Sequence, residues 1–235
     1  MIRKKQYVSW VLFYCLIISL FLLGTWFGNA AIQTISQEEI HNNRHCIIID
    51  AGHGGVDGGA TSVTGVLESE INLQFALRLN DLFNLLGYDT TMIRTADISV
   101  YTDGDTIAAK KVSDLKNRVK IVNGTVNPIL ISLHQNYFSD GKYHGAQVFY
   151  APNESSSTLA KEIQNQLVST INQGSKRVAK QADNIYLMNH IQATGVLIEC
   201  GFLSNAEEEY RLRDGNYQKQ FCCVVAATVS QYLDR

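Results

Sequence analysis

Short apolar runs alternate with longer amphipathic stretches from residue 46 to the C-terminus. Five short runs, each apolar or β-branched and followed by a turn signal, are predicted to be strands: 46–50, 88–94, 128–136, 145–151 and 194–202. Four stretches between and after them are predicted to be helices: 69–87, 108–124, 156–172 and 215–235. Strands that alternate with helices predict an α/β fold with a mostly parallel sheet covered on both faces.

The first of these predicted helices has an apolar face and a glycine at its end. Five of its apolar residues fall near one helical face: Leu73, Ala76, Leu77, Phe83 and Leu86. Gly87 is predicted to close the helix in the left-handed conformation. The segment 45–235 is long enough to bury a substantial core, so a single domain is expected there.

The N-terminal segment, residues 1–27, has a different pattern. Arg3, Lys4 and Lys5 precede the uncharged run 8–27, which as a helix would be about 30 Å long and could anchor the chain in a bilayer. A cleaved signal peptide is the alternative, because Gly28 and Ala30 are small residues placed as at a cleavage site, although the run is longer than usual. With either alternative the remaining chain is expected to be exported. Residues 28–44 are polar and aperiodic and are predicted to be a tether.

Charge and cysteine content narrow the functional classes. Without residues 1–27, the chain has 17 Lys and Arg against 22 Asp and Glu, a net charge of −5. An acidic domain without a basic cluster is a poor candidate for nucleic-acid binding. The five cysteines match neither a zinc knuckle nor a disulfide framework, and none is expected to be catalytic or a metal ligand. Cys46 and Cys200 are expected to be buried free thiols.

Polar residues occur where three of the predicted strands end. His53 follows the first strand, and His134 and Glu199 each follow an apolar run. Because the carboxyl ends of parallel strands share one edge of a sheet, these side chains are expected to converge there. Glu68 begins the first helix, and the glycine-rich loop before it is long enough to return over the strand end. Two histidines and a glutamate are a known zinc ligand set, and a carboxylate such as Glu199 would then act as the base on a water.

Each of these residues also has a structural interpretation. His53, within the glycine-rich run DAGHGGVDGGA, could be a turn residue, and Glu68 could serve only the helix dipole. His134 could be a hydrogen-bonded core histidine. Glu199 is the hardest to explain by packing, because carboxylates are rarely buried. Four further histidines are not expected to be ligands: His41, His45, His144 and His190.

Four separated motifs resemble, in order and spacing, the zinc-dependent N-acetylmuramoyl-L-alanine amidases of the Amidase_3 type: IIIDAGHGG, GVLESEINLQFA, ISLHQNYF and GVLIECGFLSN. The segments RTAD (94–97) and DLKNRVKIVN (114–123) are similar to weaker signatures of the family. The resemblance implies a twisted, mostly parallel six-stranded sheet. It also implies that His53, Glu68 and His134 bind Zn²⁺ and that Glu199 is catalytic. The chain departs from the family at Ala51, where proline is usual, and before the last strand, which lacks a common proline.

The family reaction implied is hydrolysis of the amide between the lactyl group of muramic acid and L-alanine of the stem peptide. Glu199 would take a proton from water and return it to the departing nitrogen. Asn136, two residues after His134, is predicted to help bind the carbonyl group or a sugar. Two alternatives remain: a zinc peptidase that cuts within the stem peptide, and a non-catalytic wall-binding protein.

Within the family, the chain is similar to the CwlD-type spore-cortex amidases. Three features carry this similarity: one short catalytic domain, an N-terminal membrane segment and no wall-binding repeats. It implies a role in forming muramic-δ-lactam in spore-cortex peptidoglycan, in the intermembrane space of the forespore. Because some clostridial relatives need a lipoprotein for activity, a lipoprotein partner is a further expectation.

Overall fold

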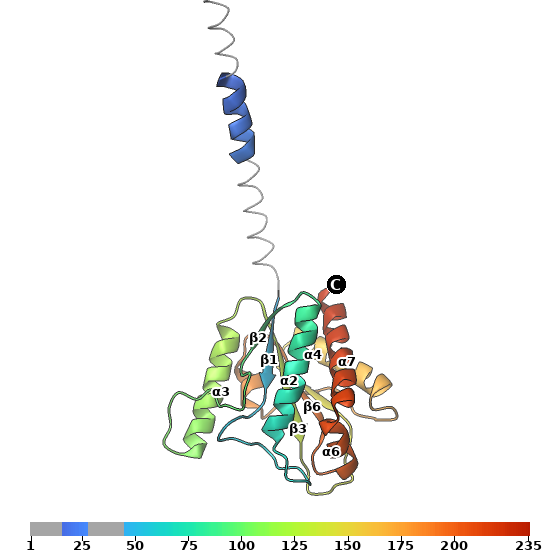
Figure 1. Cartoon of the computed structure of the whole chain (residues 1–235). Helices are drawn as coiled ribbons and strands as arrows, with labels where there is room; N and C mark the ends of the chain where they lie inside the picture. The colour runs from blue at the N-terminus through green and yellow to red at the C-terminus, as the bar shows by residue number, and fades with distance from the viewer. Residues whose placement is uncertain (1–15, 28–44) are drawn as a thin grey trace, which may run out of the picture. The chain divides into compact units, whose positions relative to one another are not determined.

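The computed structural model describes residues 16–27 and 45–235 (Figure 1). Residues 16–27 are helical, and residues 45–235 form a compact unit of their own. Within these described ranges, no helix combines the length and the apolar character needed to cross a bilayer. The predicted tether and part of the predicted membrane segment lie outside the described residues, so both stay predictions.

Six strands of the unit 45–235 form one sheet in the order β2-β1-β3-β6-β4-β5. Their bounds are β1 (Cys46–Ala51), β2 (Asp89–Met92), β3 (Pro128–Asn136), β4 (Gln147–Tyr150), β5 (Lys180–Gln181) and β6 (Thr194–Phe202). Neighbouring strands are parallel except β4, which runs antiparallel to β6. The predicted six-stranded, mostly parallel sheet is therefore confirmed.

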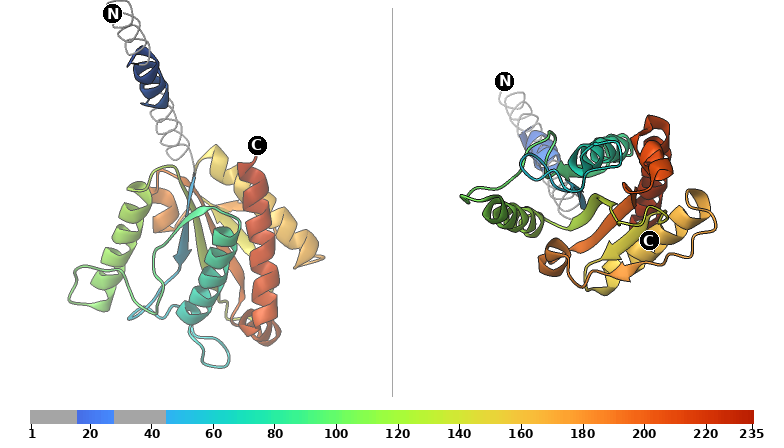
Figure 2. Two further views of the ribbon diagram at one scale, coloured as in Figure 1. Left: turned by 45° about the horizontal axis from the view of Figure 1, so that its top comes forward. Right: turned by 90° about the horizontal axis from the view of Figure 1, so that it is seen from below.

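Helices cover both faces of this sheet (Figure 2). Their bounds are α2 (Glu68–Leu85), α3 (Ile107–Asn123), α4 (Glu154–Thr170), α5 (Tyr186–His190), α6 (Ala206–Arg213) and α7 (Gly215–Leu233). The helices α2, α4, α6 and α7 pack against one face, and α3 and α5 pack against the other. The second face therefore has the smaller helical layer.

Strand alternation decides which side chains meet each layer. In β1, Ile47 and Ile49 join the core under α2 and α7, whereas Ile48 joins the core under α3 and α5. The same two-residue period places Asp50 on the α3 side. In β6, Leu197 belongs to the α3 side, which places Glu199 there too. Polar residues at the strand ends thus face the smaller helical layer.

The buried face of α2 differs from the predicted one. The residues that pack inward are Ile71, Phe75, Ala76, Leu79 and Phe83. The prediction was wrong for Leu77 and Leu86, which are 37% and 53% exposed. The inward face begins with the polar residues Glu68 and Asn72, both buried. A prediction from the spacing of apolar residues misses polar residues on the core face, and this displaced the predicted face. Gly87 has φ +81°, which confirms the predicted left-handed helix end.

Three short elements were not predicted: β5, α5 and α6. β5 has two residues at the edge of the sheet, and α5 has five residues. His190 is the last residue of α5. Elements of this length contain too few residues for a hydrophobic period to show.

Candidate metal centre and active-site cleft

Two buried arginines hold the loop that carries His53. Arg94, just after β2, donates its Nε to the Ala51 carbonyl (2.8 Å) and its Nη2 to the Gly52 carbonyl (3.0 Å). Arg118, on α3, donates its Nη2 to the His53 carbonyl (2.7 Å). These contacts hold His53 at φ +61°, a conformation that residues other than glycine seldom adopt. The two weaker sequence signatures therefore contribute the arginines that shape this loop.

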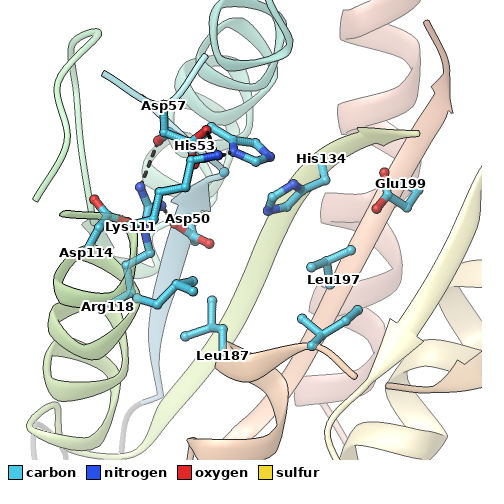
Figure 3. Close-up of a pocket in the computed structure, with 13 residues that line it drawn as sticks. Asp50, His53, Asp57, Lys111, Asp114, Arg118, His134, Leu187, Leu197 and Glu199 are labelled. Carbon is cyan, nitrogen blue, oxygen red and sulfur yellow. Dashed lines mark hydrogen bonds and ion pairs between the residues drawn. The ribbon is translucent and has the colours of Figure 1, made fainter. Parts of the chain in front are cut away.

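The charge of Arg118 is balanced by two carboxylates (Figure 3). Arg118 forms ion pairs with Asp50 of β1 and with Asp114, the latter at 2.5 Å from Nε to Oδ2. Ser132 donates a hydrogen bond of 2.6 Å to Asp50. Burial by itself would raise the pKa of Asp50, but the Arg118 guanidinium and Ser132 hold that pKa below its usual value. The buried charges beneath the loop are therefore paired, as buried charges must be.

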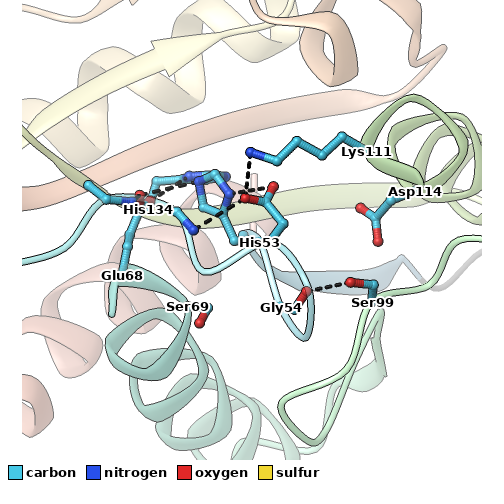
Figure 4. A network of polar contacts seen from close by, with 12 residues as sticks. His53, Gly54, Glu68, Ser69, Ser99, Lys111, Asp114 and His134 are labelled. Atoms are coloured by element: carbon cyan, nitrogen blue, oxygen red, sulfur yellow. Dashed lines mark hydrogen bonds and ion pairs between the residues drawn. The ribbon is translucent and has the colours of Figure 1, made fainter. Parts of the chain in front are cut away.

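His53, Glu68 and His134 meet where β1 and β3 end. The Glu68 carboxylate places Oε2 3.2 Å from His53 Nε2 and Oε1 2.9 Å from His134 Nδ1 (Figure 4). One donor atom from each of the three residues lies within 4.8 Å of the other two. The loop after β1, the first residue of α2 and β3 each supply one of them. The structure thus brings together the three side chains that the sequence predicted as zinc ligands.

Backbone and side-chain donors orient the Glu68 carboxylate. It accepts hydrogen bonds from the backbone amides of Ala60 (3.0 Å) and Gln135 (3.2 Å) and from Asn72 Nδ2 (3.3 Å). Burial by itself would raise the pKa of Glu68, but its contacts with His134 and His53 hold it well below the usual range. The carboxylate is therefore ionised and fixed in position, as a metal ligand requires.

Asp57 fixes the other side of the His53 ring. Its Oδ2 lies 2.9 Å from His53 Nδ1, and its Oδ1 lies 2.7 Å from Lys111 Nζ on α3. Burial by itself would lower the pKa of His53, but Asp57 and Glu68 raise it to about 9. A hydrogen bond from Nδ1 to a carboxylate leaves Nε2 for a metal, which is the usual setting of a histidine ligand. Neither Asp57 nor Lys111 was among the site residues predicted from the sequence. One feature of the sequence could have identified Asp57, namely its position four residues after His53. No local feature could have identified Lys111.

Glu199 lies beside His134, because the two residues are register partners in β6 and β3. Glu199 is partly buried, and its Oε2 is enclosed without a hydrogen-bond partner in the described part of the chain. Burial raises the pKa of Glu199 to about 7, although the nearby histidines oppose that rise. Because buried polar atoms normally have a hydrogen-bond partner, this free carboxylate oxygen indicates that a ligand binds beside it. Together with two imidazoles and a carboxylate, it fits a catalytic zinc site with a water.

A cleft of about 350 Å³ extends from these residues along the α3 side of the sheet (Figure 3). His53, His134 and Glu199 line it, together with residues of α3 and α5. Asn136 is not among the lining residues. It follows a register shift in β3, and its carbonyl accepts a hydrogen bond from Leu203. Asn136 therefore makes no contact with the cleft that supports its predicted role in substrate binding, and that role stays a prediction.

The other histidines and the cysteines stay apart from this group. His190 stacks on Tyr186 with ring centroids 3.9 Å apart, and His45 lies 3.3 Å from the Asn127 carbonyl. His41 and Cys15 lie outside the described residues. The four described cysteines are free, and none joins the cluster of His53, Glu68 and His134. Cys200 is buried as expected, whereas Cys46 is only partly buried.

The parallel sheet, the cluster of two histidines and a glutamate at its carboxyl edge, and the adjacent Glu199 define the site of a metal-dependent hydrolase. The sequence model of the N-acetylmuramoyl-L-alanine amidase family, Amidase_3, matches residues 47–231. The chain belongs to this family. Its sequence is 33% identical to the germination-specific N-acetylmuramoyl-L-alanine amidase of Bacillus subtilis, over 98% of this chain and 96% of the relative.

Solved amidase structures share the fold. The CwlD amidase from Clostridioides difficile, in complex with the GerS lipoprotein, superposes with a TM-score of 0.77 at 36% identity and covers 80% of this chain and 98% of its own. A second N-acetylmuramoyl-L-alanine amidase, from Clostridium difficile 630, has a TM-score of 0.70 at 29% identity. The alignment covers 82% of this chain and 98% of the solved chain.

Proposed function

We propose that this chain hydrolyses the amide between the lactyl group of N-acetylmuramic acid and L-alanine in peptidoglycan, with zinc as its metal. The grouping of His53, Glu68 and His134 beside Glu199, in a chain of the amidase family, carries the proposal. The alternative of a non-catalytic wall-binding protein leaves Glu199 without a purpose, because a binding module needs no base beside a metal.

His53, Glu68 and His134 would hold the zinc ion. When bound, zinc polarises a carbonyl group and makes water a nucleophile near neutral pH. Glu199 accepts the proton of the attacking water at its free Oε2 and then donates it to the departing alanine nitrogen. Burial raises the pKa of Glu199, which favours a group that must hold a proton before it passes the proton to the nitrogen. The Asp57 carboxylate keeps His53 Nδ1 hydrogen-bonded, so that Nε2 would be the nitrogen left to hold the metal.

We further propose that the enzyme acts on spore-cortex peptidoglycan during muramic-δ-lactam formation. The similarity to a germination-specific amidase spans 98% of this chain and so reaches into the N-terminal segment. That segment would keep the exported domain at the membrane, in the intermembrane space of the forespore, either as an anchor or until cleavage. A lipoprotein partner is part of the proposal, because a similar amidase was solved in complex with one.

The proposed reaction is tested with purified full-length protein, zinc and intact peptidoglycan. We expect mass spectrometry to detect released peptides with L-alanine at the free N-terminus, and a chelator to stop their release. The Glu199→Gln variant should keep its zinc but lose about 10²–10⁴-fold in kcat, the usual contribution of a general base. Cuts within the peptide would favour the zinc peptidase, and zinc-loaded protein that releases nothing would favour the wall-binding protein.

A further inference from the structure

One buried side chain contacts all three segments that carry the proposed metal ligands. Asn72 lies on α2, one helical turn after Glu68, and is buried. Its Nδ2 donates to the Gly52 carbonyl (3.1 Å), one residue before His53, and to Glu68 Oε1 (3.3 Å). Its Oδ1 accepts a hydrogen bond from Gln135 Nε2 (3.2 Å). Asn72 therefore joins the loop after β1, the start of α2 and the end of β3.

Each of these contacts lies directly beside a ligand. The backbone of Gly52 lies against the His134 ring, so closely that an added Cβ atom would be 2.2 Å from His134 Nε2. The backbone amide of Gln135, the residue after His134, donates to Glu68 Oε1 (3.2 Å). Asn72 donates to that same oxygen, so Asn72, Gln135 and Glu68 form a closed ring of hydrogen bonds. A shift of any one of the three segments would break a bond of Asn72.

The partners of Asn72 decide which way its amide group points. The Gly52 carbonyl and the ionised Glu68 carboxylate only accept hydrogen bonds, so the amide nitrogen must face them. The amide oxygen then faces Gln135, which donates its Nε2. The contacts therefore use both ends of the amide group and not only the space that it fills.

Packing alone does not explain an asparagine at this position. The buried face of α2 is otherwise apolar along most of its length, with Ile71, Phe75 and Leu79 among its residues. A buried amide costs free energy unless it is hydrogen-bonded, and an aliphatic side chain of similar size would fill the space without that cost. The three contacts also reach across to other segments, and the α2 backbone needs none of them to form a helix.

We propose that Asn72 is a positioning residue that holds the three ligand-bearing segments in place before a metal ion binds. The inference rests on the proposed zinc site. The donor atoms of His53, Glu68 and His134 already lie within 4.8 Å of one another in the chain without a metal. Zinc that binds ligands held in this way does not have to order them, so its affinity is higher. Without Asn72, the ordering would accompany binding and weaken it.

The test uses full-length protein with Asn72→Leu or Asn72→Ala, two changes that remove the amide group but differ in volume. In both variants we expect zinc affinity, measured by competition with a chromophoric chelator, to fall about 10–100-fold. The Tm of the metal-free protein should also fall, and further in Asn72→Ala, because that variant leaves a cavity. The rise in Tm on addition of zinc should be smaller than in the wild type by roughly 3 °C or more. A purely structural role would lower the Tm equally with and without zinc.

Gln164→Leu is the matched control, because Gln164 is also a buried side-chain amide that joins a helix to the sheet. It lies on α4, accepts a hydrogen bond from the Val148 amide (2.8 Å) and donates to the Ala146 carbonyl (3.2 Å). This variant should lose stability in both conditions and keep the zinc affinity of the wild type. Wild-type zinc affinity in both Asn72 variants would overturn the inference and leave the zinc site standing. A wild-type Tm that does not rise with zinc would overturn the proposed zinc site, and the role of Asn72 with it.

Discussion

His53 shows how a single ligand is oriented before any metal binds. One ring nitrogen contacts Asp57, the other contacts Glu68, and the backbone carbonyl is held by Arg118. Ring orientation and backbone conformation are therefore held by different neighbours. Asp57 and Arg118 would contribute to metal affinity without touching the metal, whereas Glu68 is itself a proposed ligand.

Replacement of Asp57 tests this role at the level of one residue. Asp57→Asn keeps the shape but removes the charge that stabilises the His53 ring, so zinc affinity should fall about 10–100-fold. Competition with a chromophoric zinc chelator measures this affinity. Asp81→Asn, an exposed change on α2, is the control and should bind zinc as the wild type does. An unchanged affinity in Asp57→Asn would show that Asp57 serves only to hold Lys111.

At the scale of elements, the site depends on how closely the loop after β1 approaches β3. A Cβ atom added at Gly52 would collide with the His134 ring. The backbone of Gly52 is not in the left-handed region, so an alanine would not strain the backbone. It would be disfavoured only by the local clash of its Cβ atom. Gly52 therefore provides clearance for the ring of the second histidine, His134.

Gly52→Ala should displace the His134 ring and weaken zinc binding more than about tenfold, in line with other losses of ligand support. Circular dichroism should still show a folded domain, because the strands do not depend on this ring. Gly215→Ala is a matched control, since its Cβ would meet only the flexible Arg78 guanidinium, at 3.3 Å. Normal zinc affinity in Gly52→Ala would mean that the loop shifts to make room at little cost.

The elements that hold the site residues also decide which of these residues could be predicted from the sequence. His134 and Glu199 were found because each interrupts a buried strand, and strand ends share an edge in a parallel sheet. Glu68 needed the family resemblance, because a glutamate at a helix start is common for electrostatic reasons alone. Lys111 was not found, because it reaches Asp57 only after α3 packs against the sheet. A contact made by packing two distant elements leaves no local pattern.

At the scale of the molecule, the two faces of the sheet have different tasks. Four helices and the larger apolar cluster cover one face, whereas α3 and α5 cover the other and leave the cleft. The three proposed metal ligands come from the loop after β1, from α2 and from β3, which belong to different layers. A bound metal would therefore link α2 to the sheet edge and stabilise the whole domain, because it binds the folded chain and not the unfolded one.

Zinc removal should thus lower the thermal stability of the entire unit 45–235 in one transition. At a zinc concentration of about 1,000 times Kd, binding contributes about 4 kcal/mol. For a domain of this size that corresponds to a Tm difference of roughly 8–16 °C, at about 2–4 °C per kcal/mol. Calorimetry of the full-length protein with zinc and with excess chelator measures the difference.

His134→Ala should melt at nearly the same temperature in both conditions, because one of the three proposed ligands is missing. Lys116→Met should behave as the wild type does. A wild-type shift below about 2 °C, or an undiminished shift in His134→Ala, would place the metal outside the cluster of His53, Glu68 and His134.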